Sequence, residues 1–134
     1  MPDLSLSKPA LLDGGMGRVL RCRGVDVPET IWSAGALLTD PDVVRQIHID
    51  YIMAGADIIT TNTYGVIRVD LAKIGIQGRF AELTRLACLL AVEARDLAGK
   101  LPGQPDLWAL GLSGDLPIIL VRVADADHAD LLPV

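Results

Sequence analysis

An aspartate followed by three glycines within four residues is the first candidate for chemistry in this sequence. Asp13 ends an aliphatic run, and the next residues are Gly14, Gly15, Met16 and Gly17. A carboxylate can pair with a cation, and glycines let a ligand lie against bare backbone. The same residues also suit a tight turn, in which the aspartate bonds to its own backbone. Both interpretations stay open at this point.

Two further polar segments follow apolar runs and are candidates for the same site. Residues 60–64 (TTNTY) follow the apolar pair at 58–59, and residues 113–115 (SGD) follow the run at 107–112. In parallel α/β folds, ligands bind at the carboxyl ends of the strands. We therefore expect Asp13 and these two segments to converge on one edge of a sheet.

The elements that must position these residues alternate between strands and helices. Buried strands are predicted at residues 10–12, 58–59 and 107–112, and long helices at residues 40–54 and 79–98. This order favours a parallel βαβαβ arrangement in the α/β class. It fits either an open doubly wound sheet or the first part of a TIM (β/α)8 barrel, which needs about 250 residues when complete.

The two long helices carry clear local signals. Asp40 can cap the first helix with Pro41 in its first position, and Gly55 suits the left-handed conformation that often follows a helix. Both helices have one apolar face, made of Val44, Ile47, Tyr51 and Ala54 in the first and of Phe80, Leu83, Ala87, Leu90, Ala94 and Leu97 in the second. Shorter, partly helical elements are expected at residues 18–23, 25–38 and 66–74.

Other cofactor motifs are incomplete. Leu20 stands where a dinucleotide-binding G-x-G-x-x-G motif needs its third glycine, and no GK[ST] follows for a P-loop. His48 and His128 lack the spacing of metal ligands, and His48, in mid-helix, is expected to be solvated or half-buried. Cys22 and Cys88 are expected to be small hydrophobic residues or inert thiols. No metal site is predicted from this chain alone.

Composition and charge exclude several classes of protein. The 134 residues are 51% hydrophobic and carry a formal net charge of -5, which is globular and acidic. Binding to nucleic acid would need a basic patch, and no polybasic segment is present for a membrane surface. No apolar stretch is long enough to span a membrane. Two isolated cysteines suit a reducing compartment, so the chain is expected to be cytoplasmic.

Three linked motifs carry a resemblance to a known family. DGGMG at 13–17, the block from WSA at 32–34 to AGAD at 54–57, and TTNTY at 60–64 resemble the N-terminal part of the homocysteine S-methyltransferases. The likeness runs from residue 10 to residue 75 and continues loosely to residue 112. It implies a TIM (β/α)8 barrel in which Zn2+ binds the sulfur of homocysteine and keeps it as a thiolate. That thiolate accepts a methyl group from a sulfonium, ammonium or folate-type donor, giving methionine.

The resemblance implies substrate-binding roles for six residues and a catalytic role for none. The aspartate would pair with the ammonium group of homocysteine, and the backbone of the two following glycines would lie against its amino-acid end. Two residues after the second strand would line the same pocket, and a tryptophan would close it. The alternatives are a turn for the aspartate and core packing for the tryptophan. The six residues are Asp13, Gly14, Gly15, Trp32, Thr61 and Tyr64.

The sequence also departs from the family pattern. Arg18 replaces a usual threonine, and the segment after residue 112 keeps only a trace of the family's Gly-Ser-x-x-Pro. The family's zinc-binding cysteines follow strands 6 and 8, and these 134 residues contain no such set. We therefore expect residues 1–134 to be a partial homocysteine-binding domain, truncated after about three strands, with open sheet edges that invite self-association. The alternatives are a non-catalytic barrel remnant and a small α/β amino-acid-binding module.

Overall fold

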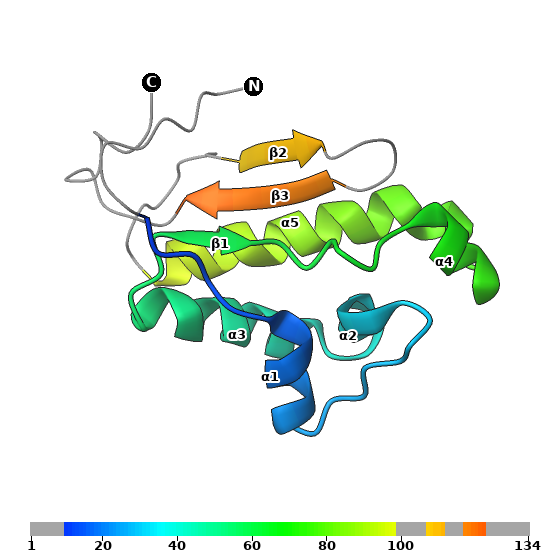
Figure 1. Ribbon diagram of the computed structural model, residues 1–134, viewed down its shortest axis with the longest axis horizontal. Helices are drawn as coiled ribbons and strands as arrows, with labels where there is room; N and C mark the ends of the chain where they lie inside the picture. The colour runs from blue at the N-terminus through cyan, green and yellow to red at the C-terminus, as the bar shows by residue number, and fades with distance from the viewer. Residues whose placement is uncertain (1–9, 99–106, 112–116, 123–134) are drawn as a thin grey trace.

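The computed structural model describes residues 10–98, 107–111 and 117–122 (Figure 1). The helices are α1 (Met16–Cys22), α2 (Gly35–Thr39), α3 (Pro41–Met53), α4 (Arg68–Lys73) and α5 (Phe80–Leu97), with the 3-10 helices η1 (Trp32–Ala34) and η2 (Gln77–Arg79). The strands are β1 (Ile58–Thr60), β2 (Leu107–Gly111) and β3 (Pro117–Arg122). The predicted third polar segment at 113–115, and His128, lie outside the described residues.

Residues 11–13 run beside β1 and are parallel to it. The backbone N–H of Asp57 donates to the carbonyl of Leu11 at 2.8 Å, and the N–H of Asp13 donates to the carbonyl of Ile58 at 3.1 Å. Leu12 forms a parallel bridge with Ile58. The predicted strand at 10–12 is thus reduced to one bridge, and the prediction that it is fully buried is wrong. Leu11 and Leu12 are 57% and 54% exposed, because no described element covers their outer side.

The sheet has the order β1-β3-β2, and both neighbouring pairs are antiparallel. The predicted strand at 107–112 is present as β2, but β3 was not predicted. Only residues 112–116 separate β2 from β3, too few for the crossover that a parallel pair needs. Strands β1 and β2 therefore run in the same direction with β3 between them (Figure 1). The barrel fold stays a prediction.

Both long helices form at the positions predicted for them. Helix α3 has Pro41 at its N-terminus, and Gly55, just beyond its end, has a φ of 111°. The side chain of Asp40 makes no capping hydrogen bond, contrary to the prediction. The apolar face of α5 is buried from Leu83 to Ala94, whereas Leu97 is 68% exposed. None of the described helices combines the length and apolar character that crossing a membrane requires.

The core lies where α3 and α5 pack against each other, beside the sheet (Figure 1). One buried cluster joins the helical elements, and a second joins α3 and α5 to strands β1 and β3. The second cluster places Ile59 of β1 against Val121 of β3, which are also paired across the sheet. Residues of the second cluster are Ile52, Ala56, Ile59, Ala91, Ala94 and Val121.

His48 is completely buried, so the prediction that it is solvated or half-buried is wrong. It lies one helical turn from both Val44 and Ile52, which are also buried, so it shares the apolar face of α3. Neither ring nitrogen has a hydrogen-bond partner. Burial lowers the pKa of His48 from 6.5 to about 4, because the charged imidazolium would lose its hydration.

The lowered pKa of His48 predicts a loss of stability in mild acid. Below pH 6.5 the unfolded chain binds a proton at this position, and the folded chain does not until about pH 4. The free energy of unfolding should therefore fall across this interval, by roughly 3 kcal/mol in total. His48→Met replaces the imidazole with an apolar side chain of similar size that does not titrate, and it should remove this contribution.

Urea unfolding of parent and variant at several values between pH 7 and pH 4 measures the difference. The gap between the two should widen in favour of His48→Met as the pH falls, because only the parent must exclude a proton. A gap that stays constant with pH would show that His48 does not titrate differently in the two states.

Candidate functional site

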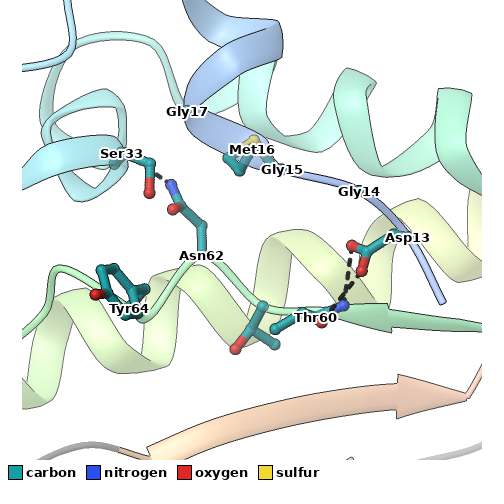
Figure 2. A pocket seen from close by; sticks show the side chains of 10 residues that line it. Asp13, Gly14, Gly15, Met16, Gly17, Ser33, Thr60, Asn62 and Tyr64 are labelled. Carbon is teal, nitrogen blue, oxygen red and sulfur yellow. Dashed lines mark hydrogen bonds between the residues drawn. The ribbon is translucent and has the colours of Figure 1, made fainter.

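The carboxylate of Asp13 accepts two hydrogen bonds from Thr60 at the end of β1 (Figure 2). One oxygen accepts from the backbone N–H of Thr60 at 3.0 Å, and the other accepts from its hydroxyl at 3.1 Å. This contact is possible because residues 11–13 run parallel to β1, which brings the carboxyl ends of both segments to one edge. The predicted meeting of Asp13 with the TTNTY segment is confirmed.

A cavity of about 340 Å3 opens at this edge. That volume is at the lower end of the range for small-molecule sites, so it suits a ligand the size of an amino acid. The cavity is formed by the start of α1, the η1 turn and the residues that end and follow β1. Its lining residues are Asp13, Gly14, Gly15, Met16, Gly17, Ser33, Thr60, Thr61, Asn62 and Tyr64.

The glycines of the DGGMG motif serve different purposes. A Cβ added to Gly14 would lie 2.6 Å from the hydroxyl oxygen of Tyr51, so this glycine makes room for the Tyr51 ring. A Cβ added to Gly15 would meet nothing within 4 Å. The bare backbone of Gly15 therefore faces open space in the cavity wall, which is the arrangement that a close-lying ligand needs.

The turn that carries η1 is held against the residues after β1. The side-chain amide of Asn62 donates to the carbonyl of Ser33 at 2.9 Å (Figure 2). A Cβ added to Gly65 would lie 1.9 Å from the carbonyl oxygen of Ile31, so the two backbones touch here. Between these contacts Trp32 has a φ of 52°, a strained value for a residue other than glycine. Such strain persists only where the surroundings impose it.

Burial raises the pKa of Asp13 above its ordinary value of 3.8, and the hydrogen bonds from Thr60 act in the opposite direction. Burial is the larger influence, because the carboxylate gives up water on the cavity wall and gains two donors in exchange. A bound cation would restore part of the lost solvation. The electrostatics of this position therefore favour a positively charged ligand group.

Five of the six predicted site residues line this cavity: Asp13, Gly14, Gly15, Thr61 and Tyr64. The sixth, Trp32, is 44% exposed and is not among the lining residues, although its neighbour Ser33 is. Tyr64 is 69% exposed and stands at the rim. The predicted roles of all six in binding stay predictions.

No substrate-binding role is predicted from the sequence for Met16, Gly17, Ser33, Thr60 or Asn62, although all five line the cavity. Of these, Thr60 and Asn62 belong to the segment that is predicted to lie at this edge. Each of the five lies inside one of the three motifs that carry the family resemblance. Thr60 and Asn62 directly precede and follow Thr61 in the chain, and Thr60 is the last residue of β1. The position of the five residues inside these motifs could have identified them as site residues, whereas their residue types could not.

The described residues do not fit a zinc site. They contain no group of three or more His, Cys, Asp or Glu side chains placed to hold a metal ion. Cys22 is exposed on α1, and Cys88 is partly buried on α5, where burial raises the pKa of its thiol and so disfavours the thiolate that binds metal. The chemistry that this cavity supports is the binding of a small cationic or zwitterionic molecule.

Comparison with known proteins identifies the same family that the three motifs resemble. Residues 10–128 match the family described as homocysteine S-methyltransferase. A Homocysteine S-methyltransferase 1 from Zea mays is 38% identical over 88 residues, and one from Brassica oleracea var. italica is 34% identical over 88 residues; each alignment covers 65% of this chain and 27% of the relative. A Selenocysteine methyltransferase from Astragalus bisulcatus is 38% identical over 91 residues, covering 67% of this chain and 27% of the relative. The chain thus spans about a quarter of the length of these relatives.

The backbone contact at Gly65 predicts that any larger residue at this position destabilises the fold. Gly65→Ala places a methyl group on the carbonyl of Ile31, and the turn at residues 31–34 must move. We expect the free energy of unfolding to drop by about 1–3 kcal/mol or more. Chemical denaturation followed by circular dichroism measures the change. Gly78→Ala is the matched control, since a Cβ there meets nothing within 4 Å, and an equal loss in both variants would contradict the assignment.

Proposed function

Because this chain belongs to the homocysteine S-methyltransferase family, we propose that its cavity binds the amino-acid end of homocysteine for methyl transfer to the homocysteine sulfur. The product of that transfer is methionine. The relatives are about four times as long as the aligned segment, so the proposal assigns substrate binding to this chain and the complete reaction to the full family domain.

The observation that carries the proposal is the placement of Asp13. Its carboxylate lies on the cavity wall beside the open backbone of Gly15, and its pKa is raised by burial. A zwitterionic amino acid supplies an ammonium group for the carboxylate. Its small Cα region can approach a glycine backbone, where a side chain would stand in the way. Thr61 and Tyr64 complete the wall from the segment after β1.

The reaction itself needs little covalent chemistry from these residues. The thiol of homocysteine loses its proton to solvent, and its sulfur forms a bond to the methyl carbon while the bond from that carbon to the donor breaks. With a sulfonium or ammonium donor, the electron pair of the broken bond stays on the donor sulfur or nitrogen, which loses its positive charge. The family resemblance implies Zn2+ for holding the thiolate. The described residues do not fit that ion, so no step proposed for this chain depends on it.

The substrate class extends to amino acids whose side chain ends in a thiol or a selenol. One relative is named for selenocysteine, and the cavity contacts proposed above involve the amino-acid end that such substrates share. Discrimination between the two side chains would therefore arise outside Asp13 and Gly15.

Asp13→Asn tests the ammonium contact. The amide has nearly the same shape and can still accept a hydrogen bond from Thr60, but it carries no charge. We expect homocysteine to bind at least about tenfold more weakly, since a hydrogen bond to a charged group contributes about 1.5–3 kcal/mol. Isothermal titration under reducing conditions measures the affinity.

Asp42→Asn is the control for the loss of a carboxylate, because Asp42 is exposed on α3 and does not line the cavity. The raised pKa of Asp13 also makes binding depend on pH. The affinity of the parent for homocysteine should fall as the pH drops, because protonation removes the charge of the Asp13 carboxylate, and this fall should begin at a higher pH than for a carboxyl group with the ordinary pKa of 3.8. Equal affinities for parent and Asp13→Asn at pH 7 would contradict the proposal.

Gly15→Ala tests the ligand contact without disturbing the stability of the fold. Gly15 has a φ of -68°, which alanine adopts without strain, and the added methyl meets no protein atom within 4 Å. We expect the unfolding midpoint to change little and homocysteine binding to weaken about tenfold or more, because the methyl group occupies ligand space. Titration and thermal unfolding of the same sample give both results. Gly78→Ala should alter neither, and unchanged binding in Gly15→Ala would place the ligand elsewhere.

A further inference from the structure

Tyr51 contacts the glycine backbone of the cavity from outside the cavity wall. Its hydroxyl donates to the carbonyl of Gly15 at 3.4 Å. A Cβ added to Gly14 would lie 2.6 Å from the hydroxyl oxygen and 3.1 Å from the ring atoms Cε1 and Cζ. Both glycines line the cavity, and Tyr51 is not among its lining residues. This backbone therefore borders the ligand space and also lies against Tyr51.

The core of the protein holds Tyr51 in place. Tyr51 belongs to α3, is partly buried and packs against both of the buried clusters. Its backbone carbonyl accepts a hydrogen bond from the N–H of Ala56 at 3.1 Å, beyond the end of the helix. A side chain that is fixed by packing presents its polar end at a defined position. Tyr51 is therefore a rigid support for the backbone that lies against it.

The two glycines need such a support, because no residue has more backbone freedom than glycine. Neither Gly14 nor Gly15 has a positive φ, so backbone conformation alone does not require glycine at either position. The ring and hydroxyl of Tyr51 occupy the space that a side chain at position 14 would need. Without the contact with Tyr51, the ligand would have to order this backbone as it binds, and its affinity would fall.

The Gly14–Gly15 backbone connects the Asp13 carboxylate to the start of α1 (Figure 2). We propose that Tyr51 is a positioning residue of the homocysteine site, which holds these two glycines where the amino-acid end of the ligand lies against them. Tyr51 acts through the glycines and does not touch the ligand. This inference rests on the proposed function and deepens it.

A second polar contact joins α1 to α3 and allows a comparison. Arg23, which directly follows α1, pairs with Asp50, the residue before Tyr51 on α3. This contact also holds α1 against α3, but it lies at the other end of α1, and neither of its residues lines the cavity. If any loosening of α1 weakened binding, the loss of either contact would have the same effect. If Tyr51 positions the glycines locally, only its own contact matters.

Tyr51→Phe removes the hydroxyl and keeps the ring in the core. We expect homocysteine to bind about three- to tenfold more weakly, while Arg23→Met keeps the affinity of the parent. The effect is modest because 3.4 Å is long for a hydrogen bond from a hydroxyl. Isothermal titration under reducing conditions measures binding. In 15N relaxation, the order parameter of the Gly15 amide should fall in Tyr51→Phe and rise again when homocysteine is added.

Gly14→Ala tests the same contact from the side of the glycine. In the parent its methyl group would meet the hydroxyl oxygen of Tyr51, so we expect the midpoint of urea unfolding to fall. Tyr51→Phe removes the closest of the three atoms that the methyl would meet. Gly14→Ala should therefore lower the midpoint less in the Tyr51→Phe background than in the parent. Strictly additive losses would show that the hydroxyl does not restrain this backbone.

The outcomes separate the inference from the function on which it rests. Equal affinities of the parent and Tyr51→Phe for homocysteine would overturn the positioning role and leave the proposed function standing. Equal weakening in Tyr51→Phe and Arg23→Met would overturn it too, because general loosening of α1 would then account for the loss. A parent protein that binds no homocysteine would overturn both. Weaker binding confined to Tyr51→Phe, with a lower order parameter at Gly15, supports the assignment.

Discussion

The pair of hydrogen bonds from Thr60 to Asp13 is the contact on which the rest of the site depends. It joins the end of residues 11–13 to the end of β1, and the residues that directly follow these two segments form most of the cavity wall. The geometry follows from parallel pairing, because parallel segments end at the same edge. The carboxylate is oriented by two donors, yet burial still raises its pKa. It is therefore held in place and incompletely solvated, and a carboxylate in this condition binds a cationic ligand group favourably.

Two further contacts hold the η1 turn beside the cavity. The backbone at Gly65 touches the carbonyl of Ile31, and Asn62 bonds to Ser33 two residues further along that turn. Together they hold Trp32 at a positive φ. The turn at residues 31–34 is therefore held against residues 62–65 by a close backbone approach, with a glycine where a side chain would prevent it. This arrangement leaves one side of the Asn62 amide committed to the fold and the other without a partner.

The core accepts unpaired polar groups away from the cavity as well. His48 on α3 and Arg95 on α5 are both buried, and both ring nitrogens of His48 and Nη1 of Arg95 lack partners. Arg95 keeps a charge-assisted bond to Asp96 at 3.1 Å, whereas His48 has none. Helical spacing explains why they are inside, since His48 lies one turn from Val44 and Arg95 one turn from Ala91. Their burial follows from the faces on which they stand.

Local sequence patterns predicted the two long helices, β1 and the motif residues of the site. Helical periodicity, Pro41 and Gly55 located α3, and the apolar pair before TTNTY located β1, because these signals act between near neighbours. The same motifs indicated the family and five of the residues that line the cavity. The barrel predicted from them stays a prediction. Which atoms meet across long separations in the chain depends on how the elements pack together. The tertiary structure placed β3 beside β1, buried His48, filled the space over Gly14 with Tyr51 and left Gly15 open. These outcomes depend on contacts between segments far apart in the chain, which no local pattern encodes.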